Sequence, residues 1–211
     1  MEALLGMNLS SFLQTTGLLG IIAVIFAESG LFIGFFLPGD SLLFTAGFLA
    51  SQGLFPVALL MIGCFVAAVI GDNVGYTFGS RAGKRIFTRE KSFLFRKDHL
   101  ERAKIFYEAH GSKTIVLARF IPVVRTFAPI VAGAAEMNYR TFFVYNMIGG
   151  GLWTFGLSGL GYFLGSIIPN VDRYLIPLVG LIVFLSLLPP VIHVLKDKKD
   201  RQAIWRWIMR S

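Results

Sequence analysis

The chain has 211 residues, of which 55% are hydrophobic and only 15% are charged, and its formal net charge is +8. A soluble domain usually carries about 25% charged residues, so the composition argues against a soluble globular protein and predicts a single all-α integral membrane domain. The positive charge does not indicate nucleic acid as a partner, because the basic residues gather beside long apolar runs.

The basic residues are concentrated in two segments. Ten of the 20 Lys and Arg residues lie within residues 81–113, and six lie within residues 196–210. Short basic loops stay on the cytoplasmic side of a membrane, where they face the anionic inner leaflet. We therefore expect residues 81–113 and the tail, residues 196–211, to be cytoplasmic.

The first half of the chain is predicted to contain a broken hairpin followed by a long helix. Residues 17–27 are either part of a span or the first arm of the hairpin. Residues 28–53 are expected to enter and leave the bilayer on the same face, with a tip near Pro38 and Gly39, because proline lacks an amide donor and glycine permits tight turns. An apolar helix then runs to Ser80. Glycine recurs at every fourth position of that helix, at Gly71, Gly75, Gly79 and Gly83. Such a stripe predicts close packing against another helix.

The second half is predicted to contain another hairpin and two spans. Residues 114–139 start inside, after the basic segment, and must return inside, because the span at residues 141–165 starts there. These 26 residues are too few for two crossings, which need about 40. A re-entrant hairpin with Pro122 and Pro129 at its tip is the simplest solution. A final span at residues 174–195 then leads to the cytoplasmic tail.

The two halves also match each other at an offset of 86 residues. Four motif pairs coincide in one register: Ala46-Gly47 with Ala132-Gly133, Met61-Ile62-Gly63 with Met147-Ile148-Gly149, Gly75-Tyr76 with Gly161-Tyr162, and Gly79-Ser80 with Gly165-Ser166. Repeat 1 covers about residues 17–80 and repeat 2 about residues 114–166. The first ends inside and the second outside, so we predict an inverted repeat with two opposed re-entrant helical hairpins and about four transmembrane or interfacial helices.

Five charged residues lie in otherwise apolar segments: Glu28, Asp40, Asp72, Arg119 and Arg125. Each is costly inside a bilayer, and such residues are functional candidates by default. Glu28 and Asp40 lie in the first hairpin, whereas both arginines lie in the second. If the hairpins face each other, acids can pair with arginines across the centre, which lowers the cost of burying them.

Each of these residues also has a simpler interpretation. Asp40 could cap a helix that starts at the next residue, and Glu28 could lie at the membrane surface. Asp72 lies near the inner end of its helix and could be half solvated. The side chains of Arg119 and Arg125 could extend to the inner surface.

The chemistry that suits these side chains is anion handling coupled to protons. Guanidinium groups bind phosphate through paired hydrogen bonds and stay charged, and the amides of broken helices attract anions. A carboxylate in low-dielectric surroundings can exchange a proton near neutral pH. We therefore expect Arg119 and Arg125 to bind the anion, and Glu28, Asp40 and Asp72 to couple protons or form ion pairs. No cofactor or metal site is predicted, because the three histidines form no metal-ligand pattern.

Four groups of residues resemble the signatures of the DedA family, the bacterial members of the VTT-domain superfamily. The first is Glu28-Ser29-Gly30 with Phe36-Leu37-Pro38-Gly39-Asp40-Ser41-Leu42-Leu43 and Ala46-Gly47, and the second is Gly71-Asp72-Asn73-Val74-Gly75-Tyr76. The third is Arg119-Phe120-Ile121-Pro122-Val123-Val124-Arg125 with Pro129 and Ala132-Gly133. The fourth is Asn146, Gly150 and Trp153. The similarity runs from about residue 17 to residue 165. Trp153 itself is expected to be a packing residue.

The resemblance implies a multi-pass protein of the bacterial cytoplasmic membrane, with two opposed re-entrant hairpins and a role in lipid transport. Some DedA proteins are similar in role to flippases that return undecaprenyl phosphate to the inner leaflet. We therefore expect a proton-coupled flippase for undecaprenyl phosphate or a similar lipid phosphate. The partners would be that lipid and protons, and a homo-oligomer is compatible with the sequence.

Two other transport functions stay open at this point. The first is a phospholipid transporter or scramblase, acting for example on phosphatidylethanolamine. The second is a proton-coupled exporter of small cations, in which the carboxylates would matter more than the arginines. An enzyme such as a membrane phosphatase is not expected, because no nucleophile, acid and base are found together in a recognisable pattern.

Overall fold

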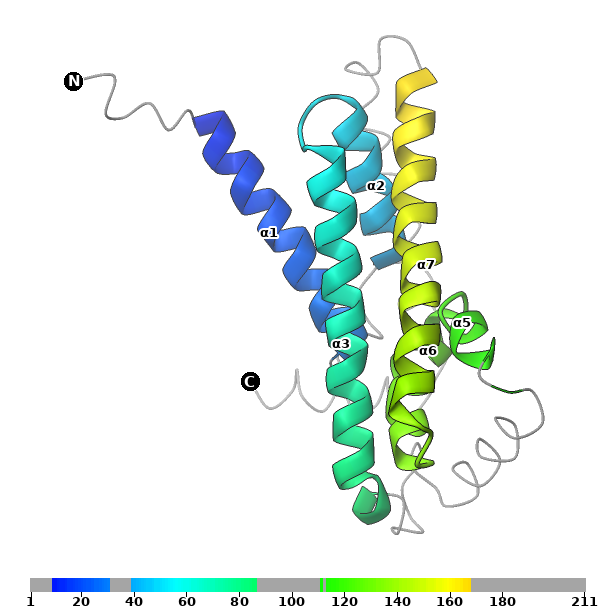
Figure 1. The fold of residues 1–211 in the computed structure, drawn as a ribbon. Coiled ribbons are helices and arrows are strands. Elements are labelled where there is room, and N and C mark those ends of the chain that lie inside the picture. The colour runs from blue at the N-terminus through cyan, green and yellow to red at the C-terminus, as the bar shows by residue number, and fades with distance from the viewer. Residues whose placement is uncertain (1–8, 31–38, 87–110, 112, 168–211) are drawn as a thin grey trace, which may run out of the picture.

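The computed structural model describes residues 9–30, 39–86, 111 and 113–167, which form six helices with no strand among them (Figure 1). The helices are α1 (Leu9–Gly30), α2 (Gly39–Ser51), α3 (Val57–Ile86), α5 (Lys113–Ala118), α6 (Pro122–Ala134) and α7 (Tyr139–Ile167). The all-α prediction is confirmed for this part of the chain. Pro38, most of the basic segment 81–113, the predicted span at residues 174–195 and the tail lie outside the described residues.

The two longest helices, α3 and α7, have 30 and 29 residues and run in opposite directions (Figure 1). At about 1.5 Å per residue, each is longer than the ~30 Å hydrocarbon core of a bilayer. Among the described residues, the segment Val57–Ala82 of α3 is the one that is both long and apolar enough to cross a membrane, with 26 residues and a mean hydropathy of 2.1. The segments Thr15–Gly30 and Val124–Ala134 are apolar but shorter.

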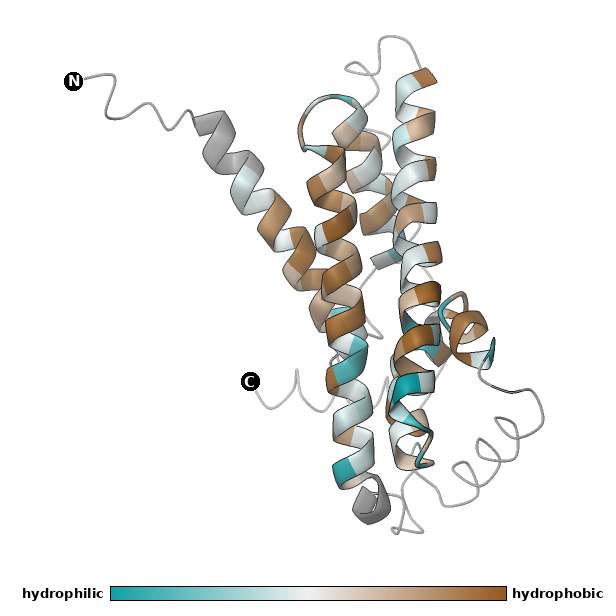
Figure 2. Ribbon diagram, in the orientation of Figure 1, coloured by the Kyte–Doolittle hydropathy of each residue, from teal (hydrophilic) through white to brown (hydrophobic). Residues whose placement is uncertain are grey.

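The outer surface of the helix bundle is apolar, whereas charged side chains lie inside it. Figure 2 shows hydrophobic residues along α1 and the first half of α3. The exposed large apolar residues of α3 recur every three or four positions: Leu59, Ile62, Val66, Ile70, Val74 and Phe78. Glu28, Asp72 and Arg119 are buried instead. This distribution fits lipid as the surrounding solvent, because intramembrane charges face the protein interior.

The two short helices α2 and α6 end in the same type of turn. After α2, the amide of Leu54 donates to the carbonyl of Leu49 at 3.2 Å and Gly53 has a φ of 79°. After α6 the hydrogen-bond pattern recurs, with Glu136 at a φ of 59°. Both turns satisfy carbonyls at the helix end, although glutamate is strained in this left-handed conformation and glycine is not. Asn138 then caps α7 through its side-chain oxygen.

Glycines bring α2 close to α7 and α6 close to α3. A β-carbon added to Gly47 of α2 would overlap the Ser158 carbonyl of α7, and one added to Gly133 of α6 would overlap the Tyr76 carbonyl of α3. The predicted glycine stripe of α3 contacts two helices. Gly71 lies against α1, and Gly75 and Gly79 lie against α6. The prediction of close packing is confirmed for these three glycines.

The two glycine-mediated contacts are equivalent to each other in the two halves. At the offset of 86 residues, α2 overlaps α6 and α3 overlaps α7, so each short helix packs on the long helix of the other half. At one end of the bundle, the side-chain amide of Gln52 donates to the Gly165 carbonyl at 2.9 Å. At the other end, the Tyr76 hydroxyl donates to the Met137 carbonyl. The turn after α2 therefore lies beside the end of α7.

Candidate functional site

A break between α5 and α6 positions both candidate arginines. The amides of Arg119 and Ile121 donate to carbonyls three residues earlier, each at 3.2 Å, which forms a tight turn. Ile121 is extended, with φ −112° and ψ 107°, as expected before a proline. Pro122 then starts α6, the position that proline favours. Arg119 thus lies in the break and Arg125 in the first turn of α6.

The residues predicted to form the hairpin tips do not all lie at a break between helices. The break lies at residues 119–121, directly before Pro122. Pro129 lies inside α6, so its placement at a hairpin tip is wrong. The reason is that the turn bonds end α5 before Pro122, and Pro129 packs in mid-helix, where its Cβ lies 3.4 Å from the β-carbon position of Gly75 on α3. Gly39 is the first residue of α2.

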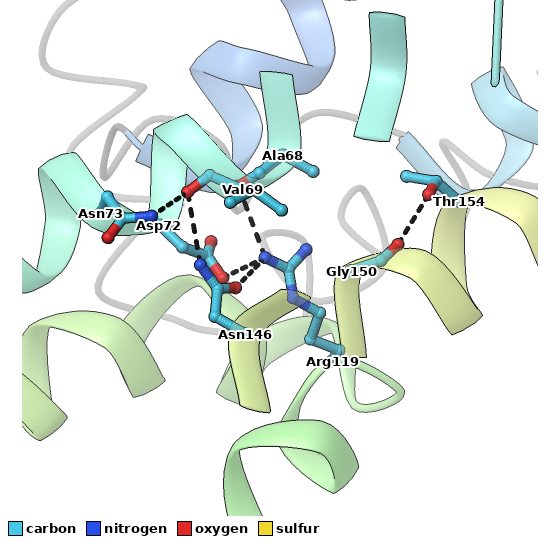
Figure 3. Close-up of polar contacts among 8 residues, drawn as sticks. All are labelled: Ala68, Val69, Asp72, Asn73, Arg119, Asn146, Gly150 and Thr154. Carbon is cyan, nitrogen blue, oxygen red and sulfur yellow. Dashed lines mark hydrogen bonds and ion pairs between the residues drawn. The ribbon is translucent and has the colours of Figure 1, made fainter. Parts of the chain in front are cut away.

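The first cluster of polar side chains is the Arg119 centre, formed by Arg119, Asp72 and Asn146 (Figure 3). One guanidinium nitrogen, Nη2, donates to Asp72 Oδ2 and to Asn146 Oδ1, and it lies 3.4 Å from the Ala68 carbonyl. The Asn146 amide donates to the Val69 carbonyl at 3.3 Å. The Arg119 and Asp72 side chains are only 4% and 6% exposed. This centre is therefore a closed ion pair with no net charge.

Glycines of α7 make room for the Arg119 side chain. A β-carbon at Gly149 would lie 3.1 Å from the Cα of Val116, and one at Gly150 would lie 3.4 Å from the guanidinium carbon of Arg119. A side chain at Gly149 would crowd the α5 backbone at Val116, and one at Gly150 would contact the guanidinium directly. Helix α7 therefore contributes to this centre through both Asn146 and the absence of side chains beside it.

The second cluster is the Arg125 centre, formed by Arg125, Glu28, Asp40 and Trp153. Arg125 Nη2 donates to Glu28 Oε1, and Nη1 donates to Asp40 Oδ1. The indole Nε1 of Trp153 donates to the same Asp40 oxygen at 2.7 Å. The Arg125 guanidinium carbon also lies 4.7 Å from the centroid of the Trp153 ring, within the range of a cation–π contact. Four helices, α1, α2, α6 and α7, thus meet at this point.

The Arg125 centre differs from the Arg119 centre in charge and in access. Two carboxylates face one guanidinium, so with both acids ionised the formal charges of +1 and −2 sum to −1. Glu28 is 1% exposed and Arg125 is 10% exposed, but the Asp40 side chain is 44% exposed. A β-carbon at Gly39 would overlap the Glu28 carboxylate, so the absence of a side chain there leaves room for that carboxylate. The second centre is thus charged and open on one side.

The structure brings the five predicted charged residues together in two groups rather than one. Glu28 and Asp40 pair with Arg125, as the sequence indicated. Arg119 pairs with Asp72 and not with either acid of the first hairpin, which corrects the expectation for that arginine. The interpretation of Asp72 as half solvated is wrong, because Asp72 is buried. Glu28 is buried inside the protein as well. Asp40 lies in the first turn of α2 but contacts Arg125 and Trp153.

Two residues of these centres were not predicted as site residues from their chemistry. Asn146 is fully buried, and Trp153, expected to be a packing residue, donates a hydrogen bond inside the Arg125 centre. Their spacing of seven residues places them on one face of α7, together with Gly149 and Gly150. The sequence feature that could have identified them is a polar amide and an indole seven residues apart in an otherwise apolar helix.

Comparisons with known proteins identify a domain family and several relatives. The VTT domain family matches residues 37–163, which is more than half of the chain. Protein DedA of Escherichia coli (strain K12) is 45% identical over 181 residues, which cover 85% of this chain and 82% of that protein. An uncharacterized membrane protein of Mycobacterium leprae is 42% identical over 171 residues, covering 81% of this chain and 76% of that protein.

A more distant relative is the inner membrane protein YqjA of Escherichia coli (strain K12), which is 32% identical over 188 residues, covering 88% of this chain and 83% of that protein. No solved structure matches the chain. The apolar exterior, the buried charges and the relatives named as membrane proteins agree with one another. The chain is a membrane protein and belongs to the DedA family, whose members carry the VTT domain.

Proposed function

We propose that this protein is a proton-coupled flippase that carries a lipid phosphate, with undecaprenyl phosphate as the first candidate, across the bacterial cytoplasmic membrane. The observation that supports this most directly is the Arg125 centre. It holds a guanidinium between two carboxylates, in a chain whose outer surface is apolar. The lipid tail would stay in the bilayer while the head group passes through the protein.

The Arg125 centre suits exchange of an anion for a carboxylate. Guanidinium groups bind carboxylate and phosphate oxygens with the same planar geometry. A phosphate group can therefore replace Glu28 or Asp40 as the partner of Arg125. Asp40, with its side chain 44% exposed, is the partner that a ligand reaches first.

Charge balance links this exchange to protons. With both acids ionised, the centre carries a charge of −1, and adding a phosphate would raise the buried negative charge further. Protonation of Glu28 and Asp40 would leave the centre at +1, which complements an anionic head group. Because uncompensated charge in a low-dielectric interior is costly, we expect protons and the anion to enter together.

Arg119 takes a different role in this proposal from the one expected at first. Its guanidinium is occupied by Asp72 and Asn146 and is almost fully buried. We assign it to holding the break between α5 and α6 against α3 and α7, which fixes the start of α6 and therefore the position of Arg125. Direct head-group binding is assigned to Arg125.

We also propose that the halves form an inverted repeat with two opposed re-entrant hairpins. The opposite directions of α3 and α7 support this, as does the packing of each short helix on the long helix of the other half (Figure 1). Leu54, after α2, would face outside and Lys113, at the start of α5, inside. In a Cys64→Ser background, Leu54→Cys should react with an impermeant maleimide in intact cells, and Lys113→Cys only after permeabilisation. The same accessibility for both would contradict the inversion.

The experiment that tests the function is transport by purified protein in liposomes. Undecaprenyl phosphate, phosphatidylethanolamine and a small organic cation are compared, with and without a pH gradient. The proposal expects gradient-stimulated movement of undecaprenyl phosphate. Rapid movement of phosphatidylethanolamine without a gradient would favour a scramblase, and cation export that survives Arg125→Lys would favour an exporter. We propose no enzymatic activity, and phosphate release from the lipid would contradict that.

A further inference from the structure

Trp153 makes two contacts in the Arg125 centre that simple packing does not require. Its indole N–H donates to Asp40 Oδ1 at 2.7 Å, and the face of its ring lies 4.7 Å from the Arg125 guanidinium carbon. Arg125 Nη1 donates to the same Asp40 oxygen. Trp153 is only 3% exposed, so water does not compete for the indole N–H. One carboxylate oxygen therefore serves two donors at once.

We propose that Trp153 is a positioning residue for anion exchange at Arg125. By donating to the oxygen that Arg125 also uses, it weakens the hold of Asp40 on the guanidinium. Its ring meanwhile keeps the guanidinium in place when the carboxylate is replaced. This inference rests on the proposed function, because it assigns Trp153 to the exchange of a carboxylate for a phosphate.

The Asp40 oxygen accepts hydrogen bonds from both the Arg125 guanidinium and the Trp153 indole. An acceptor that already receives a hydrogen bond from the indole carries less unshared negative charge, so its attraction for Arg125 is smaller. A cation–π contact depends on the charge of the guanidinium and persists whichever anion is bound. Arg125 Nε, in addition, is buried without a hydrogen-bond partner among the described residues. The guanidinium therefore retains a donor for an incoming anion.

Two substitutions separate the roles of the indole N–H and the aromatic ring. Trp153→Phe keeps an aromatic ring and removes the N–H donor, whereas Trp153→Leu removes both. Phe155→Leu is the matched control, because Phe155 lies on the same helix but is 41% exposed and contacts Phe65. A thermal melting curve for each variant shows whether it is folded before any ligand is added.

The first measurement is binding of a 15-carbon prenyl monophosphate to purified protein in micelles, by calorimetry. Trp153→Phe should weaken binding about threefold to tenfold, as expected for part of one hydrogen bond to a charged group. Trp153→Leu should weaken it about a further threefold, because the cation–π contact is also lost. Phe155→Leu should bind like the wild type. Wild-type affinity in Trp153→Phe would overturn the proposal.

A double-variant cycle shows whether Trp153 acts through Asp40. In an Asp40→Asn background, Trp153→Phe should change the affinity by less than about twofold, because the shared carboxylate is gone. An undiminished effect of Trp153→Phe in that background would also overturn the proposal, since it would place the action of the indole elsewhere.

A second measurement does not need the lipid phosphate to bind. The chain has three tryptophans, so Trp205→Phe with Trp207→Phe leaves Trp153 as the only indole emitter. Asp40→Asn and Arg125→Lys should each change its emission maximum and yield, and Phe155→Leu should not. If the prenyl phosphate does not bind but these changes occur, the proposed substrate fails and the placement of Trp153 stands. Unchanged emission in both site variants would overturn the placement itself.

Discussion

The two arginines lie only six residues apart in the sequence, yet their surroundings differ in every property that matters for binding. The Arg119 centre is neutral and nearly inaccessible, and it contains an amide whose oxygen accepts a hydrogen bond from the guanidinium. The Arg125 centre has a formal charge of −1 and a half-exposed carboxylate. A closed pair of this kind stabilises a fold or fixes its geometry, whereas an open, charged group of three can exchange partners. Proximity in sequence therefore does not imply a shared role.

The largest effect is expected from breaking the closed pair. Arg119→Leu would leave Asp72 as an unpaired charge in the interior, and removing one partner of a buried pair costs about 3–5 kcal/mol. The free energy of unfolding in micelles should fall by that amount. Arg119→Leu combined with Asp72→Leu removes both charges and should recover most of the loss, together with transport. A double variant that folds like the wild type but does not transport would show that Arg119 contacts the substrate.

The next largest effect is expected at the open centre. Arg125→Lys keeps the charge but loses the planar pair of donors, so lipid phosphate transport should fall about 10- to 100-fold, the worth of a hydrogen bond to a charged group. The melting temperature should change little, because a cation still faces Glu28 and Asp40. Arg140→Lys is the control, since Arg140 is exposed at the start of α7. Unchanged transport in Arg125→Lys would contradict the assignment of head-group binding to the Arg125 centre.

A smaller and more selective effect is expected from Glu28→Gln. With one carboxylate neutral, the formal charge of the Arg125 centre becomes zero and one exchangeable proton is lost. Transport in liposomes should lose part of its stimulation by a pH gradient, because one of the two exchangeable protons remains, and should retain its gradient-independent rate. Asp72→Asn, which alters the closed centre, should leave the response to the gradient in place in the protein that remains folded. The opposite pattern would assign proton coupling to Asp72.

The smallest effect is expected from Asn146→Leu. This change removes the amide that accepts from Arg119 and leaves the Arg119–Asp72 pair intact. The free energy of unfolding should fall by about 1–3 kcal/mol, the cost of leaving a buried donor unsatisfied. Transport per folded molecule should stay at the wild-type level. A loss of transport without a loss of stability would contradict a purely structural role for the Arg119 centre.

Pairing within the Arg125 centre could be predicted from the sequence because unlike charges in two apolar segments have few other ways to lower their cost. The partner of Arg119 could not be predicted in the same way. Asp72 lies in the middle of a long helix, and only packing against α6 and α7 decides which of its faces is enclosed. The choice between Arg119 and Arg125 as its partner is therefore a tertiary effect.

The helices themselves were predicted better than the breaks between them. Glycine spacing predicted the close contacts of α3, since small residues at every fourth position form one face. Pro129 was misleading, because the turn that contains Arg119 is closed by backbone hydrogen bonds before Pro122, and a proline is tolerated inside α6. Trp153 was expected to pack, because nothing in an apolar helix shows that an indole N–H faces a carboxylate on another helix.

A solid-state NMR distance distinguishes binding of an anionic head group at Arg125, which we predict, from binding at Arg119. Protein with ¹⁵N-labelled arginine in bilayers is mixed with a prenyl phosphate, and ³¹P dephasing of the guanidinium nitrogens is recorded. We predict a phosphorus–nitrogen distance of about 4 Å, as in hydrogen-bonded arginine–phosphate pairs. The dephasing signal should be lost in Arg125→Lys and kept in the double variant Arg119→Leu with Asp72→Leu. A signal that disappears with Arg119 and survives in Arg125→Lys would contradict the account.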